Sequence, residues 1–170
     1  MAEKYYGENA FVFCNNNSII QIDPEGKDVW EINRKGEIVN RIKDNTQDAF
    51  FIVSVNADGK MRRSQTIDNE GNLVDIGISF EYGTIKNVRT PTVKVRNSEG
   101  IVSSTKLTIF EVKGDDRATK LFEFLTNPKR TTKVEWTHAK IGNEKSEGNI
   151  VGTGHKQSST AVGQYLRASN

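Results

Sequence analysis

The sequence has 170 residues and a mass of 19.1 kDa, enough for one compact domain with a leader in front of it. Its 24 basic and 22 acidic residues are interspersed and leave a formal net charge of +2, which does not favour a nucleic acid partner. The single cysteine, Cys14, excludes an internal disulfide and any zinc site built from several cysteines.

The opening residues, MAEKYYGENAFVFCNNN, lack a basic start followed by an unbroken apolar run. The longest apolar run anywhere in the chain is only a few residues. We therefore expect neither a signal peptide nor a membrane span within these 170 residues. The sequence does not decide whether the protein is secreted or cytoplasmic.

Residues 5–30 contain four short pieces in a distinctive order: an aromatic strand (11–13), an Asn-rich turn (15–18), an apolar strand (19–22) and the turn DPEG (23–26). Together they resemble the end of the RHS repeat-associated core domain, the Tyr-Asp-repeat shell protein of bacteria. Ser18 stands where that family usually has proline. The resemblance implies that a variable C-terminal domain follows, often a toxin used in competition between bacteria.

A turn pattern recurs through the first hundred residues. Each turn begins with Asp or Asn, whose side chain can bond the backbone two residues on, and ends with glycine, which accepts positive φ. The flanking segments alternate apolar and polar residues, so most of these turns are expected to join hairpin strands. Their irregular spacing favours a β meander over a solenoid. The five turns are 23–26, 33–36, 56–59, 68–71 and 97–100.

The clearest helix covers residues 115–125. Its apolar residues fall at i, i+3, i+4 and i+7, and Asn127-Pro128 ends it. Asp115 or Asp116 is expected to cap the helix, which we favour over a metal-binding or acid/base role for the pair.

After this helix, TTKVEWTHAKIG, the turn NEKSEG and NIVGTGH predict two antiparallel strands. A second short helix, SSTAVGQYLR, is expected to begin at a cap, Ser158 or Ser159, and to present an apolar face of Ala161, Val162, Tyr165 and Leu166. The predicted fold class is α+β, with a β-hairpin-rich leader followed by a small mixed sheet and two short helices.

The segment 132–141, TKVEWTHAKI, carries a glutamate, a tryptophan and a histidine close together. If 133–141 is a strand, Glu135 lies on one face, while His138 lies on the other with Trp136. Glu135 and His138 then cannot bind one metal ion without a bulge. His138, His155 and a carboxylate would supply the three protein ligands of a catalytic zinc, but no two of these ligands are closely spaced in the sequence.

Other chemistries find no support in the sequence. One cysteine cannot meet the deaminase pattern, no Gly-x-Ser-x-Gly turn occurs, and the glycine-rich GNIVGTGH lacks the Lys-Ser/Thr of a phosphate loop.

Residues 78–167 resemble the front half of the JAB-like toxin domain found behind RHS cores in Bacteroidetes, most strongly at FEVKGDD, LFEFL and KVEW. The resemblance implies the fold of zinc metallo-isopeptidases of the deubiquitinating type. In these, a strand glutamate polarises a zinc-bound water, while a His-x-His-Pro motif and an Asp hold the metal. On this match Glu135 stands at the catalytic position, and His138 and His155 fall outside the metal motif.

No His-x-His-Pro occurs, and the sequence stops where the strand that carries it is expected to begin. We therefore expect residues 1–30 to be the end of an RHS-type core, 31–77 a β-hairpin linker region and 78–170 a partial JAB-like toxin domain. Zinc is implied for a full-length family member, but none is expected in this chain. These 170 residues are therefore expected to be inactive as a hydrolase.

These observations predict the C-terminal region of an RHS-type polymorphic toxin, a secreted effector. The alternative is a non-catalytic β-rich interaction module, an adaptor or decoy. The expected partners are proteins, either an immunity protein or a ubiquitin-like or peptide substrate. A homodimer through an uncovered sheet edge is also expected.

Overall fold

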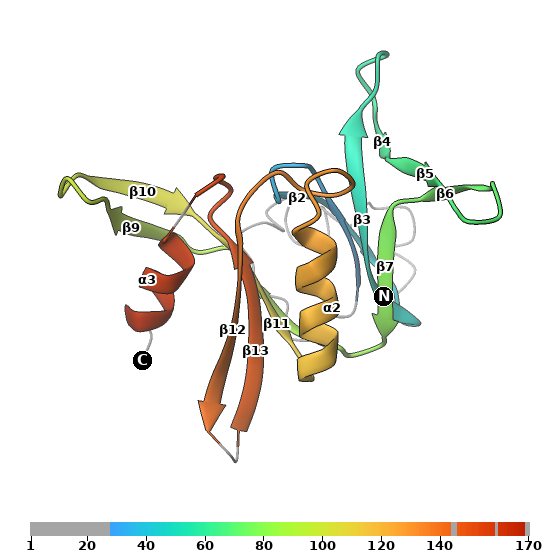
Figure 1. Cartoon of the computed structure of the whole chain (residues 1–170). Coiled ribbons are helices and arrows are strands. Elements are labelled where there is room, and N and C mark those ends of the chain that lie inside the picture. The colour runs from blue at the N-terminus through green and yellow to red at the C-terminus, as the bar shows by residue number, and fades with distance from the viewer. Residues whose placement is uncertain (1–27, 144–145, 159, 169–170) are drawn as a thin grey trace, which may run out of the picture.

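The computed structural model describes residues 28–143, 146–158 and 160–168 and confirms the α+β class (Figure 1). Almost all of the RHS-like segment at 5–30, with Cys14 and the turn at 23–26, lies outside the described residues. In the part of the chain that is described, no helix is both long and apolar enough to cross a membrane.

The first sheet is built around β3 (Gln47–Val55), which is paired along both edges. On one side β1 (Asp28–Ile32) runs parallel to β3 and forms a hairpin with β2 (Ile38–Lys43). On the other side lie β7 (Gly77–Glu81) and β4 (Met61–Arg63). The prediction of a simple meander is therefore wrong here. Because β3 is buried on both faces, it takes a central place, and β2 is left at the edge.

The second sheet has the order β12 (Trp136–Asn143), β13 (Ser146–Thr153), β11 (Thr108–Val112) and β8 (Ile85–Arg89), antiparallel throughout. The hairpin of β12 and β13 confirms the two antiparallel strands predicted after the helix. The predicted start of the first strand is wrong, because β12 begins only at Trp136. Ahead of it, the N–H of Glu135 donates to the carbonyl of Lys156, which lies beyond β13 (2.8 Å).

Two small ribbons project from the sheets, one formed by β5 (Gln65–Ile67) and β6 (Leu73–Asp75), the other by β9 (Thr92–Arg96) and β10 (Val102–Lys106) (Figure 1). As predicted, Asx-to-glycine turns close these ribbons and the hairpins β1–β2 and β3–β4. In each turn the glycine N–H donates to the Asx carbonyl, over 2.9 to 3.1 Å. The four glycines have φ between 75° and 85°, which explains the residue type.

One hydrophobic core joins the two sheets. The ring of Trp30 stacks on Phe50 at 5.0 Å, Phe50 meets Phe110 edge-on at 5.0 Å, and Phe110 stacks on Trp136 at 6.3 Å. Trp30 and Phe50 precede the predicted boundary at residue 77, whereas Phe110 and Trp136 follow it. The core therefore draws on both sides of that boundary, which itself stays a prediction.

Helix α2 (Asp115–Leu125) has the predicted bounds and covers this core with Ala118, Leu121 and Leu125. The predicted cap is wrong, because Gly114 occupies the N-cap position with φ 89° and no side-chain cap bond. Asp115 lies inside the first turn, where its charge suits the helix dipole, and its carboxylate is bonded to the β12–β13 hairpin instead.

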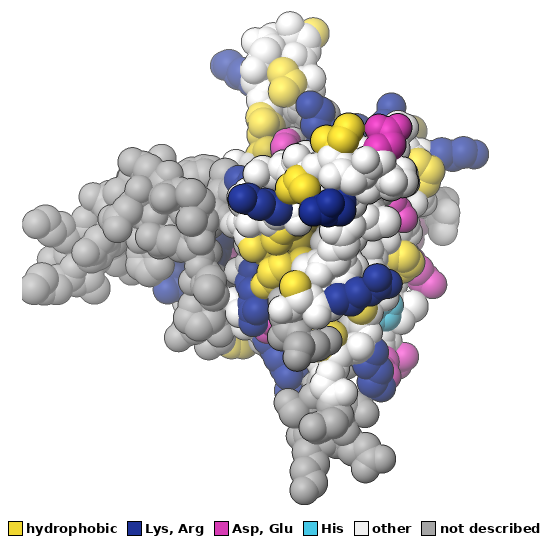
Figure 2. Space-filling model, turned by 90° about the vertical axis from the view of Figure 1, so that its left-hand side faces the viewer, with side chains coloured by type: hydrophobic (Ala, Val, Ile, Leu, Met, Phe, Trp, Pro, Cys, Tyr) yellow, Lys and Arg dark blue, Asp and Glu magenta, His cyan; other side chains and the backbone are white. Residues whose placement is uncertain are grey.

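Helix α3 (Ala161–Ala168) begins later than predicted, so Ser158 does not cap it, and Ser159 lies outside the described residues. Its predicted apolar face is confirmed, since it packs on a second cluster around Leu107, Ile109 and Ile150. Figure 2 shows the side of the molecule that carries α3 and the β9–β10 ribbon, where hydrophobic side chains lie between Lys and Arg side chains.

Candidate functional site

Glu135, the predicted catalytic residue, is exposed and lies just before β12. Its main chain is fixed at both polar groups. The N–H donates to Lys156, and the carbonyl accepts from the Thr153 hydroxyl at 2.6 Å. This places Glu135 beside the segment that follows β13, which also carries His155. The catalytic role of Glu135 stays a prediction.

Trp136 and His138 share one face of β12, as predicted, and the structure shows that this face packs toward α2. Trp136 is buried, and its indole N–H donates to the Thr132 hydroxyl at 2.7 Å. The His138 ring lies 5.9 Å from the ring of Phe122 on α2.

A polar network ties α2 to the hairpin. The buried Asn149 donates its amide N–H to Asp115 at 2.9 Å, so its amide oxygen turns to His138 Nε2, also at 2.9 Å. A carbonyl oxygen only accepts, which means that His138 carries a proton on Nε2. Asp115 also accepts from Lys140 (2.9 Å). These bonds, from Asn149 first and then Lys140, hold the pKa of Asp115 below its usual value.

His155 lines a separate pocket of about 350 Å³. Its Nδ1 lies 2.9 Å from the Lys35 carbonyl, and its Nε2 lies 3.1 Å from the Thr108 hydroxyl. Burial lowers the pKa of His155. The sequence did not predict these partners, because Lys35 is 120 and Thr108 is 47 residues away along the chain and no local pattern indicates such distant contacts.

The metal ligands implied by the family resemblance do not fit this arrangement. Within residues 28–143, 146–158 and 160–168, no group of three or more His, Cys, Asp and Glu side chains could hold a metal ion. His138 and His155 are each bonded to different elements, one to β13 and the other to Lys35 and β11. The absence of zinc from this chain stays a prediction.

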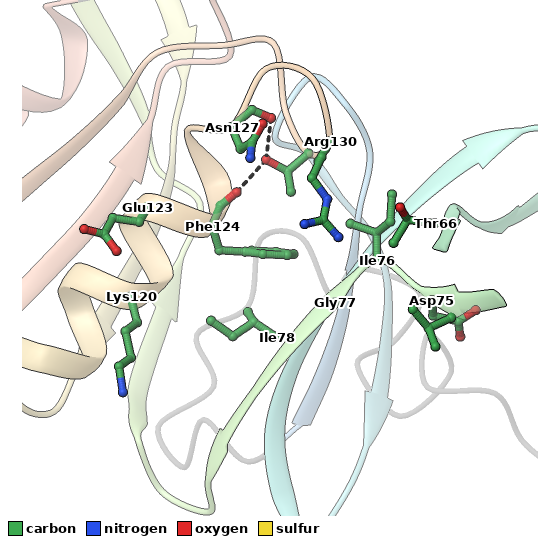
Figure 3. A pocket seen from close by; sticks show the side chains of 12 residues that line it. Thr66, Asp75, Ile76, Gly77, Ile78, Lys120, Glu123, Phe124, Asn127 and Arg130 are labelled. Carbon is green, nitrogen blue, oxygen red and sulfur yellow. Dashed lines mark hydrogen bonds between the residues drawn. The ribbon is translucent and has the colours of Figure 1, made fainter. Parts of the chain in front are cut away.

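A larger groove of about 490 Å³ lies between α2 and β7. In Figure 3, Phe124 from α2 and Ile78 from β7 point into the space between these elements, and the guanidinium of Arg130 points into it from the turn after α2. Val74 and Asp75 of the β5–β6 ribbon continue the groove at one end. The groove offers apolar side chains beside charged groups of both signs, a combination suited to binding another chain.

Comparison with known proteins identifies one similarity. Residues 110–170 match the family model described as JAB-like toxin 1, a region that runs from β11 through α2 and the β12–β13 hairpin to α3. The resemblance predicted for residues 78–167 is thus confirmed over this part. No curated protein and no solved structure matches the chain.

Proposed function

We propose that this chain is the C-terminal region of a bacterial toxin effector of the RHS type. The match of residues 110–170 to a JAB-like toxin family supports this proposal, and so do the four RHS-like pieces at residues 5–30. In this proposal β11, α2, β12, β13 and α3 are part of the toxin domain, and Glu135 stands at the position of its catalytic glutamate.

The proposal includes inactivity of these 170 residues as a zinc hydrolase. Both ring nitrogens of His155 are bonded, Nδ1 to the Lys35 carbonyl and Nε2 to the Thr108 hydroxyl, so a metal shared with His138 would require His155 to give up one of these partners. A lone glutamate cannot generate a metal hydroxide.

Metal analysis tests this part of the proposal. The purified chain, loaded with zinc and dialysed, is expected to retain far less than one zinc per chain, and Glu135→Gln to retain the same amount. Stoichiometric zinc that is lost when His138 and His155 are replaced by alanine would contradict it.

The RHS assignment is tested on the DNA that encodes the chain. The reading frame is expected to continue upstream into repeats of the Tyr-Asp type. A frame that has its own start and no such repeats would exclude this assignment while leaving the toxin similarity intact.

A second candidate function, a non-catalytic interaction module, is favoured by the β5–β6 ribbon. Ile67 and Leu73 on this ribbon are 67% and 65% exposed, next to the groove between α2 and β7. Such side chains are typical of a protein contact. The expected partner is an immunity protein encoded beside the toxin.

Co-expression with the neighbouring gene product, followed by size-exclusion chromatography, tests this candidate. Leu73→Asp is expected to abolish the complex. Val102→Asp, on the other ribbon and 49% exposed, is the matched control and should leave it intact. Equal effects of both variants would count against the β5–β6 ribbon as the contact.

A further inference from the structure

The pocket beside His155 lies where several elements meet. Its walls come from the start of β2, the link between β8 and β9, the end of β10, the start of β11 and the segment after β13. Junctions of this kind are common places for ligand sites. The lining residues are Glu37, Ile38, Val39, Thr90, Lys106, Thr108 and His155.

The hydrogen bonds of His155 fix its tautomer. The Lys35 carbonyl can only accept, so Nδ1 carries the proton and donates to it over 2.9 Å. In the neutral ring Nε2 then holds a lone pair, which accepts the hydroxyl proton of Thr108 over 3.1 Å. A hydroxyl bonded to an imidazole that a third group orients is the arrangement of a nucleophile and its general base.

The surroundings keep this imidazole neutral at physiological pH. Burial is the largest influence and lowers the pKa of His155, and nearby Lys106 acts in the same direction. The bond to Lys35 and the charge of Glu37 oppose this shift without reversing it. A neutral imidazole can take up a proton, as a base must.

The backbone of His155 is also unusual. Among the described residues it is the one non-glycine residue with positive φ, at 60°. Its N–H donates to the Thr153 hydroxyl at 3.1 Å, which holds it in this conformation. Backbone conformations of this kind persist where surrounding contacts determine them, often at functional sites.

Two further groups in the pocket can stabilise negative charge that develops on a bound carbonyl oxygen. The hydroxyl oxygen of Thr90 is buried and has no hydrogen-bond partner in the described structure, and Lys106 brings an ammonium group. A buried hydroxyl without a partner is uncommon, and a bound carbonyl oxygen would satisfy it.

We propose that this pocket is an acyl-transfer site for small carboxylic esters, with Thr108 as nucleophile and His155 as general base. Thr108 is only 2% exposed, so the acyl group must be small enough to enter a space of about 350 Å³. This activity is independent of the zinc chemistry of JAB-like proteins and goes beyond the proposed function.

The reaction has two balanced halves. Thr108 Oγ1 bonds to the ester carbonyl carbon while His155 Nε2 takes the hydroxyl proton. The bond to the alcohol oxygen then breaks, and His155 returns the proton to that oxygen. In the second half water attacks the acyl-threonine and gives a proton to His155. His155 passes that proton to Thr108 Oγ1 as the free acid leaves.

The test uses the full chain with p-nitrophenyl acetate. Peptide mapping by mass spectrometry is expected to find acetyl on Thr108, and Thr108→Val to lose this adduct. His155→Gln should slow p-nitrophenolate release from the site by about 100-fold or more, the usual contribution of a general base. The rate should also fall as the pH is lowered and His155 takes up a proton.

Thr105→Val is the matched control, because Thr105 is a buried threonine that lies on β10 and does not line the pocket. It should leave both acetylation and rate unchanged. Acetyl found on lysines but not on Thr108 of the folded wild-type chain would overturn the proposal, whatever the stability of the variants. Thr108→Ser should retain the adduct, and its loss in a folded Ser variant would also count against the site.

Discussion

At the scale of the residue, the imidazole of His155 links pH to stability. Burial lowers its pKa in the folded protein, whereas in the unfolded chain it titrates near its ordinary value of about 6.5. The unfolded state therefore binds the proton more readily. The stabilising contribution is present above that ordinary value and is lost as the pH falls below it.

We expect the wild-type chain to lose more stability between pH 7.5 and pH 5.5 than His155→Gln does. Urea unfolding at the two pH values measures the difference. His138→Gln is the control, because it removes the other histidine and leaves His155 in place. The same pH dependence in wild type and His155→Gln would show that His155 is not the titrating group.

Gly77 is required by packing at the start of β7. A Cβ there would lie 2.5 Å from Cδ1 of Phe51 and 2.9 Å from the carbonyl oxygen of Phe50. The Phe51 ring has little room to move away, because the guanidinium of Arg63, a residue of β4, lies 3.8 Å from the ring centroid. Gly77→Ala is expected to destabilise the protein by about 1–3 kcal/mol, as overpacking does.

Gly163→Ala is the matched control for Gly77→Ala. Nothing lies within 4 Å of a Cβ at this helical position. Alanine there should be neutral or stabilise by up to about 1 kcal/mol. Thermal unfolding of both variants makes the comparison. A Gly77→Ala variant as stable as the wild type would mean that β7 can shift away from Phe51.

At the scale of the element, local patterns predicted what depends on neighbours in sequence. The stripe at residues 115–125 gave the bounds of α2, and the Asx-to-glycine turns gave four hairpins, because both depend on a few adjacent residues. The parallel pairing of β1 with β3 and the late start of β12 depend on distant contacts. The partners of His155 were unpredictable for the same reason.

Replacing Asn149 tests how α2 is held to the β12–β13 hairpin. It is buried on β13 and joins His138 to Asp115. Asn149→Ala removes both bonds and leaves the His138 N–H without its acceptor, which is expected to cost about 1–3 kcal/mol. Amide hydrogen exchange should rise in α2 and β12. Ser104→Ala, at an exposed position of β10, should change neither stability nor exchange.

At the scale of the whole molecule, β12 has a pairing neighbour on one side only among the described strands. An edge strand of this kind can pair with a second copy of the chain, although Lys140 on it weakens the tendency. We expect a concentration-dependent dimer in analytical ultracentrifugation. A single monomeric species across micromolar concentrations would argue against pairing through this edge.

The shared core predicts that residues 78–170 do not fold alone. Phe110 packs on both Trp30 and Phe50, and β1 and β3, which carry them, are absent from such a fragment. Each large apolar side chain that is left uncovered loses about 1.5–3 kcal/mol of stabilising free energy from burial. The free energy of unfolding of a typical domain is only about 5–15 kcal/mol. The fragment is expected to bind a hydrophobic dye and to give poorly dispersed amide NMR signals, whereas residues 28–170 should give the spectrum of the folded core. Well-dispersed signals from 78–170 would instead establish residue 78 as the start of an independent toxin domain, with β1 and β3 only docked against it.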